Sequence, residues 1–163
     1  MTDRVQTGGS DRPPSAAEPQ SETLRSFRRS LPVLLLTARE AVMTYFRPML
    51  RAHGLTEQQW RVLRALDSEG PVEAAELARL TSILPPSLSR ILKLVERKGW
   101  ITRRSNQSDL RRTVIAISAK GRTVIRKIAP EAEAQHRRIT ESFGAEEADA
   151  LVRELIRLAM LKP

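Results

Sequence analysis

Between residues 85 and 118 the spacing of apolar side chains changes from a helical to a strand period, and this change constrains the fold more than any other feature. The first part carries apolar residues three and four positions apart, namely Leu88, Ile91, Leu92 and Val95. This pattern is typical of the buried stripe of an amphipathic helix, and Gly99 predicts its end. Residues 101–104 and 111–118 then predict two short strands joined by a polar turn. We therefore expect a β-hairpin directly after this helix.

Helical periods also fill the rest of the chain from about residue 30. Pro32 predicts a first helical turn, His53-Gly54 the end of that helix, and Thr56 the N-cap of the next one. A short helix is expected from Glu73 to about residue 80, before the helix that opens at Pro85-Pro86. Two more helices follow over 119–142 and 145–161, and their short connection predicts a roughly antiparallel pair.

These elements predict a mainly α protein with a small β-hairpin, arranged as a winged helix-turn-helix. We expect residues 1–23, which are polar and aperiodic, to form a disordered tail, and residues 24–163 to form a single domain. Its winged core would span about 56–118. The helices over about 30–53 and 119–161 carry apolar stripes that one small domain could not fully cover, which predicts a homodimer. The alternative is that they pack together as an intramolecular bundle.

The basic residues are concentrated in one segment. The chain has a net charge of +9, and residues 79–112 carry nine basic and two acidic side chains. A local excess of this kind indicates a polyanionic partner such as nucleic acid. The chain has no cysteine, two histidines, no Gly-rich phosphate loop and no metal-ligand spacing, so we expect no enzyme activity, cofactor or metal. No apolar run approaches the ~20 residues of a membrane span, and no signal pattern opens the chain, so a cytoplasmic protein is expected.

The helix that begins at Pro85 is the predicted DNA-recognition helix. Its polar and basic side chains face away from the apolar stripe, and the candidate contacts are Ser87, Ser89, Arg90, Lys93 and Arg97. In a major groove the N-terminal hydroxyls and Arg90 would meet base edges, while the later cations would meet phosphates. The alternative is an ordinary surface helix with a solvated basic face. The short helix before it and the basic hairpin after it favour recognition.

The turn of the hairpin carries an acid close to two arginines. Asp109 precedes Arg111 and Arg112, and a carboxylate beside a guanidinium can hold it in one orientation for a narrow minor groove. The alternative is a solvated turn with an ion pair of little energetic value.

Several segments together resemble the MarR family of bacterial transcriptional regulators. They are residues 55–63 (LTEQQWRVL), 76–78 (ELA), 86–92 (PSLSRIL), 109–112 (DLRR) and 117–121 (ISAKG), in the order and spacing of that family. Residues 38–43 (AREAVM) and 52–60 (AHGLTEQQW) further resemble the branch that represses homoprotocatechuate (4-hydroxyphenylacetate) degradation operons. The resemblance covers about residues 30–161 and implies a dimer formed by the first and the last two helices.

The resemblance also implies a small aromatic acid as effector, bound between the first helix and the winged core. Residues at that junction suit such a ligand, namely Arg39, Glu40, Met43, His53 and Trp60. Arg39 could pair a carboxylate, His53 or Glu40 could meet a phenolic hydroxyl, and Met43 and Trp60 could form apolar walls. The alternatives are that Trp60 is plain core, His53 a helix C-terminal cation and Arg39 part of a surface or dimer ion pair.

These observations favour a repressor that binds a pseudo-palindromic operator in double-stranded DNA and is released by an aromatic acid. An architectural protein that coats DNA without regulated release is the main alternative, and it would need no internal pocket. A basic amphipathic protein acting at membranes is a third class, which the two-stranded hairpin and the acidic tail disfavour.

Overall fold

The structure is a computed structural model that describes residues 27–105 and 113–161. The described chain begins with a short 3-10 turn at Phe27–Arg29, and its regular elements then follow in sequence order. They are α1 (Leu31–Ala52), α2 (Glu57–Glu69), β1 (Val72–Glu73), α3 (Ala74–Thr81), α4 (Pro85–Arg97), β2 (Ile101–Ser105), β3 (Thr113–Ile117), α5 (Ala119–Phe143) and α6 (Ala145–Ala159). The predicted class, mainly helical with a small winged hairpin, is therefore confirmed. The predicted tail lies outside the described residues.

The ends of the helices follow the local chemistry that the sequence indicates. Thr56 caps α2 in a capping box, since its side chain accepts from the Gln59 N–H and the Gln59 side chain accepts from the Thr56 N–H. Pro32 lies in the first turn of α1, and Pro85-Pro86 open α4. Beyond α4, Gly99 adopts a left-handed φ of 71°, which lets the chain turn into β2.

The three strands form one antiparallel sheet in the order β1-β3-β2. The β2–β3 hairpin runs in register from Ile101 opposite Ile117 to Ser105 opposite Thr113. The sequence predicted both of these strands but missed β1, a two-residue strand that pairs Val72 with Ile115. A strand this short has no period to detect, and it forms because β3 offers it a free edge.

One hydrophobic core joins the winged region to the C-terminal part of α1 and the first half of α5. Val62, Leu63 and Leu66 of α2 are fully buried at its centre. The core is completed by Leu77 of α3, by the apolar stripe of α4, and by side chains of α1, β2, β3 and α5, namely Phe46, Met49, Leu50, Ile101, Ile115, Ile117, Ile125 and Ile128. Packing of these faces around α2 holds α3, α4 and the sheet as one unit.

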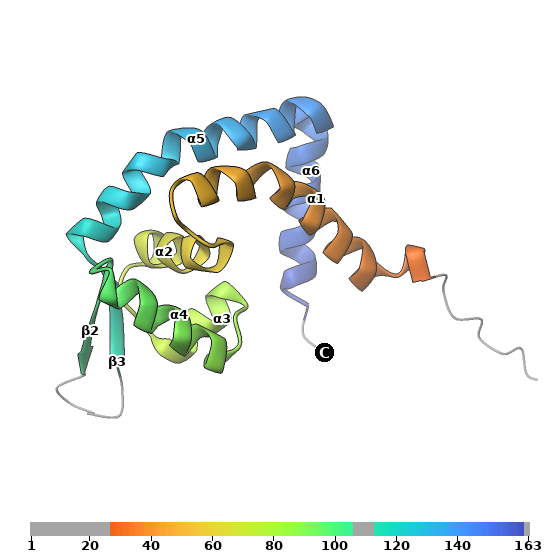
Figure 1. The fold of residues 1–163 in the computed structure, drawn as a ribbon. Coiled ribbons are helices and arrows are strands. Elements are labelled where there is room, and N and C mark those ends of the chain that lie inside the picture. The colour runs from red at the N-terminus through yellow and green to blue at the C-terminus, as the bar shows by residue number, and fades with distance from the viewer. Residues whose placement is uncertain (1–26, 106–112, 162–163) are drawn as a thin grey trace, which may run out of the picture.

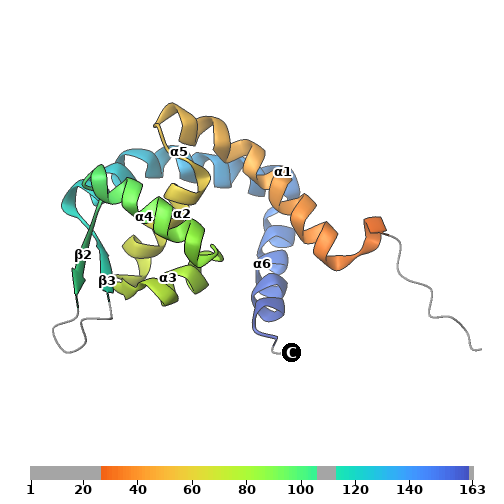
Figure 2. The same cartoon turned by 60° about the horizontal axis from the view of Figure 1, so that its bottom comes forward.

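The last helix departs from the expected arrangement. Both views show that α6 leaves the end of α5 at a steep angle and passes beside α1, rather than running back along α5 (Figures 1 and 2). The prediction of an antiparallel pair is therefore wrong. Its physical reason is that α6 has no buried residue in the single chain, so no packing against α5 aligns the two helices.

Apolar side chains remain uncovered where α1 meets α6. Leu31, Leu34 and Leu35 of α1 and Leu151 and Leu155 of α6 are each more than a third exposed. They line a groove of about 500 Å³ between the two helices. The intramolecular bundle considered above does not form, because these two stripes are still open to solvent. No helix within the described residues is both long and apolar enough to cross a membrane.

Candidate nucleic-acid interface and adjoining pockets

The helix α4 has one buried and one exposed face. Its buried face consists of the predicted stripe, Leu88, Ile91, Leu92 and Val95. All five predicted contact residues lie on the exposed side, and they are Ser87, Ser89, Arg90, Lys93 and Arg97. The helix thus presents two hydroxyls near its N-terminus and three cations along its length. This arrangement matches that of a helix able to lie in a major groove.

A tight joint between α3 and α4 sets the direction of the exposed face. Thr81, the last residue of α3, is buried, and its hydroxyl donates to the Leu77 carbonyl at 2.6 Å. Ser82 then adopts a left-handed φ of 50°, and the Ile83 N–H donates back to the Ala78 carbonyl at 3.1 Å. These contacts close the end of α3 before α4 begins.

The β2–β3 hairpin extends beside α4 at the same end of the molecule (Figure 1). Its predicted tip residues, Asp109, Arg111 and Arg112, lie outside the described residues, so their roles stay predictions. Within β2, Arg104 is exposed, while Arg103 turns toward α4 and pairs with Glu96 through Nε and Oε2 at 2.9 Å. This ion pair between the hairpin and α4 was not predicted, because it depends on the angle at which β2 leaves the helix.

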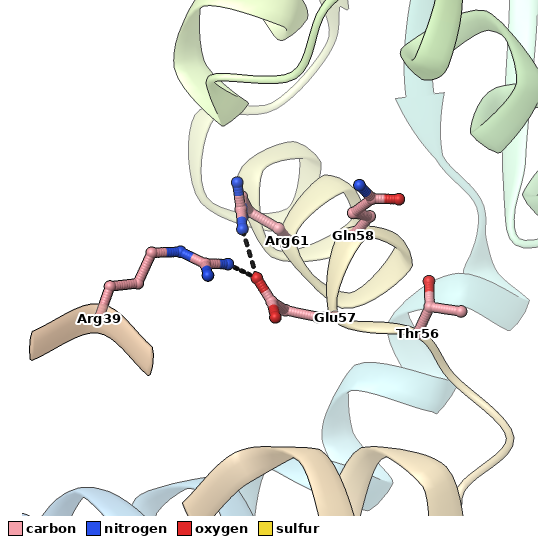
Figure 3. Close-up of a pocket in the computed structure, with 5 residues that line it drawn as sticks. All are labelled: Arg39, Thr56, Glu57, Gln58 and Arg61. Atoms are coloured by element: carbon pink, nitrogen blue, oxygen red, sulfur yellow. Dashed lines mark hydrogen bonds and ion pairs between the residues drawn. The ribbon is translucent and has the colours of Figure 1, made fainter. Parts of the chain in front are cut away.

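A layer of ion pairs connects α1 to α2 on the side of the core away from the hairpin. Glu57, in the first turn of α2, pairs with Arg39 of α1 and accepts from Arg61 Nη2 at 2.6 Å (Figure 3). Arg61 Nη1 also donates to the Thr81 carbonyl at 3.0 Å. Together with Thr56 and Gln58 these three residues line a polar cavity of about 430 Å³.

A second cavity, of about 380 Å³, shares the same three charged residues but has mostly apolar walls. Its lining consists of Arg39, Val42, Met43, Phe46, Glu57, Trp60, Arg61, Arg64 and His136. The Arg64 guanidinium lies over the Trp60 ring at 5.9 Å from its centroid. We call this cavity the aromatic pocket, because it combines a stacking surface, apolar walls, three guanidinium groups and one carboxylate.

The aromatic pocket brings together three of the five residues that the sequence suggested for an effector, Arg39, Met43 and Trp60. Glu40 lies beside it, where it accepts from Arg47 and Arg39 at 2.6 Å each. The hydrogen bond from Arg47, in particular, lowers the pKa of Glu40 below its usual value. His53 lies apart from the pocket, at the C-cap of α1, and its Nε2 pairs with Glu131 Oε1 of α5 at 2.8 Å.

The charged residues that α2 contributes to the aromatic pocket were not predicted from the sequence. Glu57 and Arg64 come three residues before and four after Trp60, and Arg61 comes four after Glu57, so the three charged residues lie near Trp60 on one side of α2. That spacing around the tryptophan was a usable signal. His136 of α5 had none, because its place in the lining depends on how α5 packs over α1, where its ring meets Phe46 edge-on at 4.9 Å.

Comparison with known proteins shows that the sequence of this chain is similar to those of transcriptional regulators. A sequence model described as "MarR family" matches residues 53–112. The homoprotocatechuate degradative operon repressor of Escherichia coli is 38% identical over 122 residues, which are 75% of this chain and 82% of that protein.

Two solved structures are similar over most of their length. NadR in complex with 4-hydroxyphenylacetate has a TM-score of 0.76 and 35% identity, with 85% of this chain and 98% of NadR covered. The transcriptional repressor CouR bound to a 23-mer DNA duplex has a TM-score of 0.72 and 28% identity, covering 80% and 92% of the two chains.

Proposed function

The chain belongs to the MarR family of transcriptional regulators, and on this basis we propose that it represses transcription by binding operator DNA and releases it when an aromatic acid enters the aromatic pocket. The single observation that carries the DNA-binding part is the exposed polar and basic face of α4 beside the hairpin. The protein acts by binding and carries out no catalysis.

The operator is proposed to be a pseudo-palindrome read by a homodimer. The open groove between α1 and α6 would receive the same helices of a second copy, which removes its apolar side chains from water. A two-fold dimer presents its two α4 helices to half-sites about one helical turn, ~10 bp, apart. Footprinting should therefore show a protected pseudo-palindrome. Protection of one unpaired half-site, or uniform coating as expected for an architectural protein, would contradict the proposal.

The effector is proposed to be a hydroxylated phenylacetate. Trp60 and Phe46 provide surfaces for an aromatic ring, and Arg39, Arg61 and Arg64 provide cations for a carboxylate. Glu57 is the acceptor on the same lining that a phenolic hydroxyl would require. NadR, which is 35% identical, was solved with a ligand of this class, and this similarity supports the choice.

Release follows from a difference in affinity between two arrangements of the dimer. The ligand must bind better to a state whose α4 helices are misplaced for successive major grooves than to the DNA-ready state, because equal affinity shifts no equilibrium. The pocket lies between α1, which carries the dimer groove, and α2, which supports the winged core, so a ligand there contacts both parts. An architectural protein would have no use for such a pocket.

Calorimetry with 4-hydroxyphenylacetate and 3,4-dihydroxyphenylacetate tests the effector directly. We expect one of them to bind the full chain and to dissociate its DNA complex. Arg39→Ala should abolish the response while keeping DNA affinity, since Arg39 lines the pocket and no residue of α4 does. Arg51→Ala is the matched control on the same helix, because Arg51 is exposed and outside the pocket lining. If no aromatic carboxylate binds at millimolar concentration, the effector proposal fails.

A further inference from the structure

Arg61 occupies a position between the aromatic pocket and the joint that aims the recognition helix. Its Nη2 donates to Glu57 in the pocket at 2.6 Å, and its Nη1 donates to the Thr81 carbonyl at 3.0 Å. Figure 3 shows its guanidinium directed from α2 toward Glu57, on the side from which Arg39 also approaches. One planar group thus contacts both the predicted ligand site and the last residue of α3.

The Thr81 carbonyl needs a donor from outside its helix. The last four carbonyls of an α-helix have no intrahelical partner. At the end of α3, the Ser82 N–H donates to the Arg79 carbonyl and the Ile83 N–H donates to the Ala78 carbonyl. The Thr81 carbonyl accepts from Arg61 instead. Ser82, Ile83 and Leu84 then lead directly into α4. The position of Arg61 is therefore part of what holds the α3–α4 joint in place.

We infer that Arg61 is the positioning residue through which occupation of the aromatic pocket displaces the recognition helix. The inference rests on the proposed function and adds the route of its regulation. A phenolic hydroxyl on Glu57, or a carboxylate on the Arg61 guanidinium, competes for the Glu57–Arg61 contact. Because the guanidinium is a rigid fork, Nη2 cannot turn to a new partner without moving Nη1 from the Thr81 carbonyl. The joint then loses a charge-assisted hydrogen bond, and α4 loses its DNA-ready direction.

Arg61→Met tests this route, because it keeps an apolar stem and removes both contacts. Arg47→Met is the matched control. Arg47 also pairs with Glu57, at 3.5 Å, but its other partner is Glu40 of α1, so Arg47 makes no contact with α3 through these two ion pairs. Operator affinity is measured on the footprinted duplex at fixed salt, with and without 4-hydroxyphenylacetate. Ligand binding is measured separately by calorimetry. The exchange rates of the Ser82 and Ile83 amide hydrogens are also measured, with and without ligand.

In the wild type we expect the ligand to weaken operator binding by a factor of about 5 to 150, which is typical for coupled sites. Arg61→Met should bind the operator at least about 5-fold more weakly without ligand. At a ligand concentration that calorimetry shows to saturate this variant, the ligand should change its operator affinity less than about twofold. The two amides should exchange faster in Arg61→Met and in the liganded wild type, while Arg47→Met behaves as the wild type. A purely structural role would lower the unfolding midpoint but leave the ligand's factor unchanged.

The outcomes separate this inference from the proposed function. If 4-hydroxyphenylacetate does not bind the wild type, the effector fails, yet the ligand-free comparison of Arg61→Met with Arg47→Met still decides the role of Arg61. If the ligand binds and Arg61→Met matches the wild type in operator affinity and release, the inference is overturned and the effector stands. Should Arg61→Met unfold, Arg61→Lys serves instead, because its single nitrogen cannot keep both contacts at their present positions.

Discussion

A methyl group at Gly121 should destabilise the protein, although glycine to alanine in a helix normally does the opposite. Gly121 is buried in the first turn of α5, where its N–H donates to the Ser118 hydroxyl at 3.0 Å. A Cβ built on this residue would overlap the Trp100 carbonyl oxygen and lie 2.8 Å from Ile117 Cγ1. The carbonyl cannot simply move away, since it accepts the Ser118 N–H at 2.9 Å and belongs to the backbone that leads into β2.

The expected cost can be worked from these contacts. Forcing a methyl group into a packed site costs about 1–3 kcal/mol, and weakening the hydrogen bond to the Trp100 carbonyl adds about 0.5–1.5 kcal/mol. Replacing a glycine inside a helix by alanine by itself stabilises the folded state by about 0.5–1 kcal/mol. Together these effects range over about 0.5–4 kcal/mol, so the free energy of unfolding should fall by about 2 kcal/mol in Gly121→Ala. For a chain of this size that is equivalent to roughly 4–8 °C in Tm.

Urea unfolding followed by circular dichroism measures this change. The protein concentration is kept fixed, because the stability of a protein that is proposed to dimerise depends on it. Arg122 is the matched control, since it is exposed on the same helical turn. There alanine should be more stable than glycine by about 1 kcal/mol. Gly121→Ala should also weaken DNA binding, because a displaced Trp100 carbonyl moves the start of the hairpin. A Gly121→Ala midpoint equal to or above that of the wild type would refute the steric argument.

Four further changes follow, three at the DNA interface and one at an ion pair of α1. Arg90→Ala should weaken operator binding by about 1–3 kcal/mol and relax sequence preference; equal weakening on operator and random duplex would make Arg90 a phosphate contact. Arg111→Ala should reduce DNA affinity without changing the unfolding midpoint, and Asp109→Ala should do so more mildly, so an unchanged affinity of Asp109→Ala at low salt would exclude an orienting role. Glu40 has its pKa lowered chiefly by the hydrogen bond from Arg47, so its contribution to stability is present above its unfolded pKa and is lost as pH falls through the lower folded value. Glu40→Gln should accordingly lower the urea midpoint slightly at pH 7, and this difference from the wild type should shrink as the pH is lowered below the unfolded pKa of a glutamate.

The parts of the fold that local chemistry determines were predictable. The capping box at Thr56, the prolines that open α4 and the apolar stripe of α4 each act within a few residues, so the sequence places them correctly. The hairpin followed from the loss of the helical period after Gly99. The predicted DNA-facing residues of α4 lie on its exposed side for the same reason, since burial of the stripe leaves the opposite face in solvent.

The parts that depend on the angles between helices were not predictable. The partner of His53, which the sequence places at the end of α1, is Glu131 of α5, and a contact between residues 78 positions apart cannot be read from the sequence. The direction of α6 was missed because its apolar face finds no cover within the single chain. That Arg39 of α1 faces the charged side of α2 appears only when α1 crosses α2, and no period along one helix reports a crossing.

The position of α2 explains how one small domain could read DNA and sense a ligand without a separate sensor domain. One side of α2 contributes Val62 and Leu66 to the core that supports α4 and the sheet. The other side contributes Glu57 and Trp60 to the aromatic pocket. A packed core transmits a small displacement of such a shared helix instead of absorbing it, because its side chains have no free volume in which to relax. A ligand therefore needs only to favour one placement of α2 against α1 to alter the direction of α4. Arg61 extends from α2 to the end of α3, so it is the first contact through which that change reaches the recognition helix.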